Sequence, residues 1–369
     1  MATVQMIIGG GFLGAGKTTL LAAAAALLAQ RGKRVGLLTN DQAPGLVDTA
    51  LLKQQGFEVG EVAGGCFCCR FDQFVQAADR LVSDNWPEVL IAEPVGSCTD
   101  LAATVIQPLQ DLYAGRFRVS PYTVLVEPQR LREALAGEAA SAFDPKVQYI
   151  YAKQLEEAEL IAINKSDLLK EAEVQSLKKK TGARFPQARV ASFSALNGEG
   201  VEQWLELMLS QSSAGGHSAE VDYDTYAEGE AALGWLNATI RLEGPEGTSW
   251  RDFTGKLLTR LQAELKTRRA EVAHLKVFLS ARGVAIFGNL TSTAGAPVLR
   301  ERGVCGKDTT SAWLTLNARA AMEPAELKAA VEQSLRVLAT GGRRAEITML
   351  EHFKPGRPQP VHRYTQPKA

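Results

Sequence analysis

Three cysteines, Cys66, Cys68 and Cys69, lie within four consecutive positions, although the whole 369-residue sequence contains only five cysteines. A disulfide within this group would be strained, because bridged cysteines need Cα atoms roughly 4.4–6.8 Å apart and converging Cβ atoms. Three clustered thiolates can instead bind Zn²⁺, or the softer Cu⁺, and leave one coordination position for a further ligand, a water molecule or a group of another protein. The alternative is that the thiols only fill space in the core. The spacing predicts a metal site at these three cysteines.

A second group of residues has the pattern of a phosphate-binding loop. Residues 11–18 read GFLGAGKT, which matches G-x-x-x-x-G-K-[ST], and they lie between a predicted strand and a predicted helix. In this setting backbone N–H groups surround the phosphates, Lys17 reaches the β- and γ-phosphates, and the Thr18 hydroxyl ligates Mg²⁺. The residues of this region expected to bind the nucleotide are Gly14, Ala15, Gly16, Lys17, Thr18 and Thr19.

Two further segments indicate which base the nucleotide carries. Asn164, Lys165 and Asp167 occur in the order N-K-x-D at the end of a predicted strand. A carboxylate at Asp167 can accept hydrogen bonds from N1–H and the N2 amine of guanine, which adenine does not offer. The segment Ser194-Ala195-Leu196 follows another strand and can present a backbone N–H to guanine O6. A polar turn is the alternative interpretation of N-K-S-D alone, but together the motifs favour GTP over ATP.

Acidic residues at the ends of two other predicted strands could assist hydrolysis. Glu93 closes the segment EVLIAEP and can hold the Mg²⁺ shell through water, while the N–H of Gly96 can sense the γ-phosphate. Asp41 ends the second strand and is assigned to a Mg²⁺-bound or attacking water; a surface turn is the alternative. The residues assigned to catalysis are Lys17, Thr18, Asp41 and Glu93. Because no arginine finger can be assigned, intrinsic hydrolysis is expected to be slow.

Cys98 follows Gly96 closely and permits two interpretations. It could be a fourth metal ligand that approaches the cysteine trio in one nucleotide state. The favoured interpretation is a thiol at a helix start near the nucleotide.

The elements that must position these residues follow from the hydrophobic pattern. Six apolar segments, separated by segments of helical length, predict a parallel sheet covered on both faces, as in a doubly wound α/β fold. The predicted strands are residues 4–10, 34–40, 88–94, 122–128, 160–167 and 188–195.

The composition changes near residue 211, where Gly, Ser and acidic residues predict a linker. Beyond it the order βαβββαβ predicts a smaller α+β domain that resembles a split βαβ sheet. The predicted boundaries are a P-loop domain at 1–211, a linker at 212–233, an α+β domain at 234–354 and an extended or disordered tail at 355–369.

The bulk composition excludes several classes of partner. Lys plus Arg equals Asp plus Glu at 41 each, which gives no support for a general nucleic-acid or anionic-membrane surface. No segment has 18 consecutive apolar residues, and the first apolar run is read as a strand rather than a signal peptide. A cytoplasmic protein with reduced thiols is expected, in which clustered cysteines indicate metal binding or catalysis.

The motifs GGFLGAGKTTLL, GGCFCC, the Glu93-x-x-Gly96 strand end and INKSDLL together resemble the CobW-type family of SIMIBI P-loop GTPases. The resemblance covers residues 4–210 and implies a metal chaperone whose C-x-C-C motif binds a divalent metal, usually zinc, under control of the nucleotide. It also implies a client metalloenzyme and a homodimer that pairs across the nucleotide face. This sequence departs from the family pattern at Asn40-Asp41-Gln42 and Pro94-Val95, and with only four histidines it lacks a metal-rich histidine stretch.

These observations lead to one principal hypothesis and two alternatives. The principal hypothesis is a GTP-hydrolysing metallochaperone or insertase, in which Gly64-Gly65 allow the cysteine loop to switch. The first alternative is a GTP-dependent guard or loading factor for a cofactor enzyme, such as a cobalamin enzyme, with a structural zinc. The second is a GTPase tuned by redox-sensing cysteines.

Overall fold

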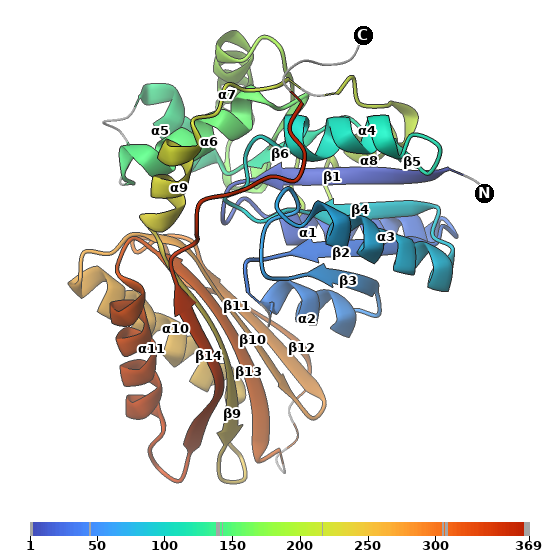
Figure 1. Ribbon diagram of the computed structural model, residues 1–369. Helices are drawn as coiled ribbons and strands as arrows, with labels where there is room; N and C mark the ends of the chain where they lie inside the picture. Colours follow the sequence, from blue (N-terminus) through green and yellow to red (C-terminus); the bar gives the residue numbers. More distant parts are fainter. Residues whose placement is uncertain are drawn as a thin grey trace. The chain divides into compact units, whose positions relative to one another are not determined.

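The computed structural model describes residues 3–43, 46–137, 141, 143–215, 217–304, 306 and 309–364 (Figure 1). The chain divides into two compact units. The first comprises Met1–Gln42, Leu52–Gly229 and Arg357–Ala369, and the second comprises Ala43–Leu51 and Glu230–Gly356. Among the described residues, no helix combines the length and the apolar character needed to cross a membrane.

The first unit contains an eight-stranded sheet, counted over the described residues, in which every strand pair is parallel. The strand order is β3-β2-β4-β1-β6-β7-β8, and β5 pairs with β1. The strands are β1 (Val4–Gly11), β2 (Val35–Asn40), β3 (Glu58–Val62), β4 (Val89–Glu93), β5 (Phe117–Val119), β6 (Thr123–Val126), β7 (Leu160–Ile163) and β8 (Arg189–Ser192). The central strands are nearly continuous apolar runs that are buried on both faces, so the predicted doubly wound α/β fold is confirmed.

Helices cover this sheet. Helix α1 begins in the phosphate-loop motif, and α3 begins directly after the cysteine segment. In α1 the small side chains of Ala24 and Ala25 are fully buried together with Leu21, so the helix packs closely against the sheet. The helices are α1 (Lys17–Gln30), α3 (Phe71–Asn85), η1 (Ala102–Ile106), α4 (Gln107–Leu112), α5 (Pro128–Ala136), α6 (Pro145–Glu156), η3 (Ser166–Leu168), α7 (Glu171–Arg184), α8 (Val201–Ser210) and α9 (Tyr223–Ala231).

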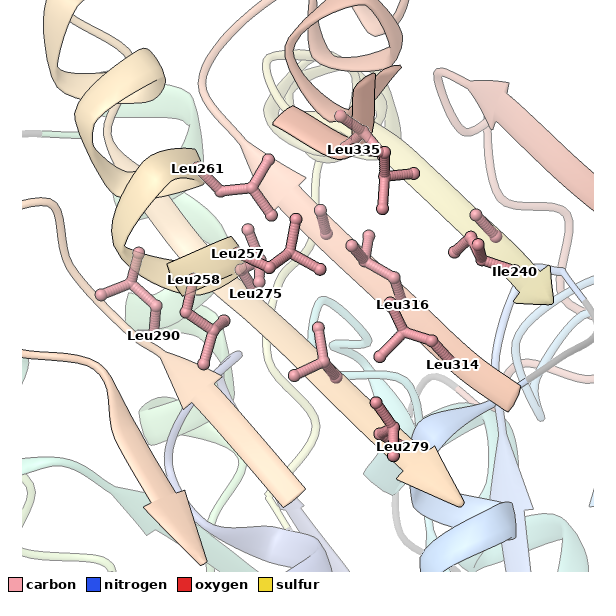
Figure 2. Close-up of a cluster of buried hydrophobic side chains, with 14 of the residues drawn as sticks. Ile240, Leu257, Leu258, Leu261, Leu275, Leu279, Leu290, Leu314, Leu316 and Leu335 are labelled. Atoms are coloured by element: carbon pink, nitrogen blue, oxygen red, sulfur yellow. The ribbon is translucent and has the colours of Figure 1, made fainter. Parts of the chain in front are cut away.

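The second unit is an antiparallel sheet of six strands, counted over the described residues, with two long helices. The strand order is β12-β11-β10-β13-β9-β14. The elements are β9 (Gly234–Glu243), α10 (Trp250–Thr267), β10 (Val272–Ala281), β11 (Val284–Leu290), β12 (Val298–Gly303), β13 (Ser311–Ala320), α11 (Pro324–Leu338) and β14 (Arg344–Phe353). Figure 2 shows the core, in which leucines of α10 and α11 pack against leucines of the sheet.

The structure contains strands that the sequence analysis did not predict, and its domain boundaries differ from the predicted ones. In the first unit the short strands β3 and β5 were missed. In the second unit strand β12 was missed because it is polar and mostly exposed, so no apolar alternation marks it. The predicted linker at 212–233 contains helix α9, and it belongs to the first unit as far as Gly229. The last described residues, Arg357 to Tyr364, have no helix or strand of their own but also belong to the first unit.

A segment that begins two residues after Asp41 belongs to the second unit. Residues 43–51 include most of α2 (Val47–Gln54), although the sequence placed them in the first domain. The Val47 N–H donates to Asn317 Oδ1 at 2.8 Å, and Lys276 Nζ lies 2.7 Å from Asp48 Oδ2. A short amphipathic helix carries no local signal of which sheet it will cover, so this placement depends on these long-range partners.

Candidate functional site

The phosphate-binding loop joins β1 to α1. Gly11, Gly14 and Gly16 have φ values of +126°, +82° and +95°, in the region that favours glycine. Helix α1 begins at Lys17, whose Nζ donates to the carbonyl oxygens of Gly11 at 2.8 Å and Phe12 at 3.3 Å. Thr19 lies in the first turn of α1 and is half-buried. A curled loop followed by a helix N-terminus is the geometry that binds phosphate.

Strands β2, β4 and β1 are neighbours in the parallel sheet, so the residues at their carboxyl ends share one edge. At this edge the Thr18 hydroxyl donates to Glu93 Oε1 at 3.0 Å, and both side chains are buried. A Cβ atom at Gly96 would lie 2.6 Å from Leu13 Cδ2 and 3.1 Å from the Leu13 backbone nitrogen, so glycine lets this segment lie close beside the loop. Asp41 is also buried, and its Oδ1 accepts a hydrogen bond from the Gln42 N–H at 2.6 Å.

Asn164 connects the two segments predicted to bind the base with the phosphate loop. Its Nδ2 donates to the Ala15 carbonyl at 2.8 Å, and its Oδ1 accepts from the Ala195 N–H at 2.9 Å. Lys165 has a left-handed backbone with φ +60°, and burial lowers the pKa of its ammonium group. The structure thus brings these segments and the phosphate loop to one place.

The remaining members of these segments differ in exposure. Asp167 lies in η3 and is exposed, as is Leu196, whereas Ser194 is fully buried. An exposed carboxylate beside exposed apolar side chains can receive a planar base.

The three predicted metal ligands form one cluster at the start of α3. The Cys66 Sγ lies 2.8 Å from Cys68 Sγ and 3.1 Å from Cys69 Sγ, and the remaining Sγ–Sγ distance is 3.8 Å. The N–H groups of Cys69 and Arg70 both donate to the Cys66 carbonyl, which winds the segment into a turn before the helix. Among the described residues, this trio is the one group of His, Cys, Asp or Glu suited to hold a metal ion.

Hydrogen bonding within the cluster shifts the pKa values of the three thiols in different directions. Hydrogen bonds with Cys68 and then Cys69 hold the pKa of Cys66 well below its usual value. The same interaction with Cys66 raises the pKa of Cys68 well above its usual value and that of Cys69 to about 12. Cys66 and Cys68 are buried, and Cys69 is half-buried. A metal ion held by all three sulfur atoms would need each cysteine to bind as a thiolate, so metal binding would release protons.

Cys98 lies near this cluster without joining it. It is buried, and its hydrogen bond to Cys66 contributes to the lowered pKa of that thiol. It is not among the three described residues whose sulfur atoms all lie within 4.8 Å of one another. Gln154 Nε2 donates to the carbonyl oxygens of Gly96 and Cys98 at 3.1 and 2.8 Å, which fixes the segment after β4.

Asn40 is a residue of the site that sequence reasoning missed. Its Nδ2 donates to the carbonyl oxygens of Val62 at 2.9 Å and Gly65 at 2.7 Å, and its Oδ1 accepts from the Phe67 N–H at 2.9 Å. One buried amide thus holds both sides of the cysteine loop, and it directly precedes Asp41. Its place before Asp41, at the end of the second predicted strand, was visible in the sequence, but its partners 22 to 27 residues away were not.

Comparison with known proteins adds to this geometry. The family model described as CobW/HypB/UreG, nucleotide-binding domain, matches residues 5–192. The protein named Zinc chaperone CobW of Sinorhizobium sp is 28% identical over 214 residues, or 51% of this chain and 58% of that protein. Zinc chaperone YeiR of Escherichia coli K12 is 32% identical over 141 residues, or 36% of this chain and 42% of that protein. The chain therefore spans about half the length of the curated relatives it matches.

A solved structure is also similar. The Zn(II)-bound YjiA GTPase from E. coli matches 90% of this chain and 99% of that chain, with 14% sequence identity and a TM-score of 0.38.

Proposed function

This chain belongs to the CobW/HypB/UreG family of nucleotide-binding proteins, and from that membership we propose that it is a GTP-hydrolysing metallochaperone. In this proposal Cys66, Cys68 and Cys69 bind a divalent metal, chiefly Zn²⁺, and the nucleotide state controls its transfer to a client metalloenzyme. Two of its relatives are named zinc chaperones, which supports Zn²⁺ as the metal.

The nucleotide half of the proposal depends on three groups of residues. The N–H groups from Gly14 to Thr18 would bind the phosphates, with Lys17 turning from the loop carbonyls to the β- and γ-phosphates. Asp167 would accept from the guanine edge, while the Ala195 segment is held by Asn164 for contact with O6.

The oxygen atoms of Thr18 and Glu93 suit Mg²⁺, because this hard cation prefers oxygen ligands and keeps several of its waters. Mg²⁺ bound with the nucleotide would neutralise charge on the β- and γ-phosphates. Thr18 would contact it directly and Glu93 through water. The Asp41 carboxylate would orient the attacking water, and Gly96 would contact the γ-phosphate through its N–H.

The single observation that carries the coupling is the position of Asn40. Its backbone is continuous with Asp41, at the edge where the phosphates would bind, and its side chain holds the cysteine loop through Val62, Gly65 and Phe67. A shift of Asp41 on binding the γ-phosphate would therefore move the three hydrogen bonds that shape the loop.

The test is the Zn²⁺ affinity of the purified protein, measured by competition with a chromophoric chelator. We expect Zn²⁺ to bind about tenfold more tightly with a non-hydrolysable GTP analogue than with GDP, which corresponds to an ordinary coupling of about 1.4 kcal/mol. Equal affinity in both states would contradict nucleotide-controlled metal transfer.

Base selectivity gives a separate prediction. In Asp167→Asn the carboxylate that accepts from guanine is replaced by an amide, and GTP affinity should fall about 100-fold, because two hydrogen bonds to a charged group are lost. ATP affinity should change little. Fluorescent-nucleotide titration measures both, with Glu171→Gln, an exposed acid in the next helix, as the control. Unchanged GTP affinity would remove Asp167 from the site.

A second candidate function is a GTP-dependent guard or loading factor whose zinc is structural. The burial of Cys66 and Cys68 favours it, because structural zinc sites are closed. It predicts equal Zn²⁺ affinity in the two nucleotide states and a cofactor enzyme that depends on this protein but not on Cys66. A redox sensor receives less support: among the described cysteines, the thiol with the lowered pKa is buried, and the half-buried Cys69 has a raised pKa.

Two partners belong to the proposal. Metal transfer requires a client metalloenzyme or cofactor enzyme. A homodimer that forms across the nucleotide face in the GTP state would let two cysteine trios share one ion.

A further inference from the structure

The last described segment of the chain, Arg357 to Tyr364, lies against the first unit, to which it belongs. We call these eight residues the strap. Figure 1 shows the segment in dark red, and its far end lies beside α4, where the Tyr364 hydroxyl donates to Asp111 Oδ2 at 2.6 Å. The sequence predicted an extended or disordered tail here.

The strap contacts the cysteine loop directly. The Gln359 N–H donates to Cys69 Sγ at 3.1 Å, and the Val361 N–H donates to the Cys68 carbonyl at 2.9 Å. The His362 ring stands edge-on to the Phe71 ring, with centroids 5.0 Å apart. These contacts are spaced along four residues of the strap, so backbone and side chains together lie over Cys68, Cys69 and the first residue of α3.

One ion pair fastens the end of the strap. Arg363 Nε lies 2.7 Å from Asp100 Oδ2, and the Asp100 side chain is 0% exposed. Asp100 also accepts from the Tyr223 hydroxyl at 2.6 Å, and its φ of +66° is unusual for a residue other than glycine. The Tyr364 N–H donates to the Ala103 carbonyl at 2.9 Å, next to this pair.

The ion pair between Arg363 and Asp100 has one buried and one partly exposed partner, so it can hold the strap in place and can still open. Removing the cation that pairs with a buried carboxylate is strongly unfavourable, since it leaves an uncompensated buried charge. Arg363 itself is 35% exposed, so water can reach it and the pair can open. By contrast, Arg357 pairs with Asp224 in a bridge whose side chains are 53% and 77% exposed, which is expected to contribute little.

We propose that the strap is a releasable cover of the cysteine site, fastened by Arg363 to Asp100, and that it must open for a metal ion to enter or leave. This inference rests on the proposed function of the cysteines as a metal site. Cys69 is the least buried thiol of the trio, and it is also the thiol whose sulfur accepts from the strap. The strap therefore lies where a chelator or a client would reach the metal. Its N–H would also stabilise a metal-bound Cys69 thiolate, as hydrogen bonds around metal ligands do.

The test compares Arg363→Gln with Arg357→Gln, the same substitution in the same segment at a pair that is already solvent-exposed. The protein is loaded with Zn²⁺, and transfer to a chromophoric chelator in excess is followed by stopped flow. We expect Arg363→Gln to transfer Zn²⁺ about tenfold faster than the parent, which corresponds to about 1.4 kcal/mol in the barrier. Arg357→Gln should match the parent within about twofold, as for exposed ion pairs. Equal transfer rates for all three proteins would overturn the proposal.

A second readout separates the strap from the metal hypothesis. In the metal-free protein, the rate at which iodoacetamide labels Cys69 is measured by peptide mass spectrometry for the same three proteins. Faster labelling of Cys69 in Arg363→Gln would support the strap as a cover, whether or not the protein binds Zn²⁺. If none of the three proteins binds Zn²⁺, the proposed metallochaperone function is wrong, but the cover is not. Labelling at the parent rate would overturn the cover.

If Arg363→Gln fails to fold, as judged by circular dichroism and thermal unfolding, Tyr364→Phe provides the milder variant, because it removes a single hydroxyl, which donates to Asp111. The same two rates then decide the proposal: faster transfer and labelling support it, and rates equal to those of the parent overturn it.

Discussion

Replacing Cys66, Cys68 and Cys69 together with serine is expected to lower the affinity for Zn²⁺ by at least about 1,000-fold, because the thiolates supply most of the binding free energy of such sites. The three sulfur atoms already lie within 3.8 Å of one another at the start of α3. A serine hydroxyl keeps the volume of the side chain but does not ionise at neutral pH. Chelator competition in the presence of GDP and of the GTP analogue measures the loss.

Cys98→Ser is the matched control for this result. If three thiolates hold the metal, Cys98→Ser should keep the parent affinity within about threefold, as expected for a buried thiol that is not a ligand. A loss of about 10- to 100-fold would instead show that Cys98 supports the site through its hydrogen bond to Cys66, and a larger loss would make Cys98 a fourth ligand. Parent-like affinity in the triple variant would contradict the metal site itself.

Removing the Asn40 side chain is expected to separate the two halves of the protein's proposed activity. Asn40→Ala loses three hydrogen bonds to the cysteine loop, from the carbonyls of Val62 and Gly65 and the N–H of Phe67. The predicted tenfold difference in Zn²⁺ affinity between the GTP-analogue and GDP states should fall to about twofold or less, since the coupling passes through contacts that are absent. Nucleotide affinity should stay near that of the parent.

The same substitution should also destabilise the fold, and this needs its own control. Leaving the buried partners of Asn40 unpaired should lower the free energy of unfolding by about 1–3 kcal/mol. Gln5→Ala removes another buried amide, which donates to Ser120 Oγ and the Met208 carbonyl near the start of β1, far from its loop end. Gln5→Ala should lower stability comparably while keeping the nucleotide dependence of Zn²⁺ binding. If both variants lose the dependence equally, general destabilisation explains the loss and the role of Asn40 is wrong.

The second unit shows which elements could be predicted from sequence patterns and which could not. Its long strands and two helices were predicted from apolar periodicity, because their inward faces build one core (Figure 2). Strand β12 escaped prediction, since pairing with β11 and not an apolar face makes it a strand. The segment 43–51 escaped for a related reason, because its partners Lys276 and Asn317 lie more than 220 residues away.

The sequence by itself predicted the family and the parallel sheet, both of which are confirmed, and it located the phosphate-loop motif, the two segments expected to bind the base and the cysteine trio. Each of these motifs is contiguous, so the residues that do the chemistry lie together before folding and their spacing carries the information. Only the tertiary structure decided what surrounds them. Asn40 reaches the cysteine loop across 22 to 27 residues, and the strap reaches Cys69 across 290. These contacts join ordinary polar residues and backbone groups that are far apart in the sequence. They form because the sheet and the end of the chain bring those residues together, and no local sequence pattern predicts that proximity.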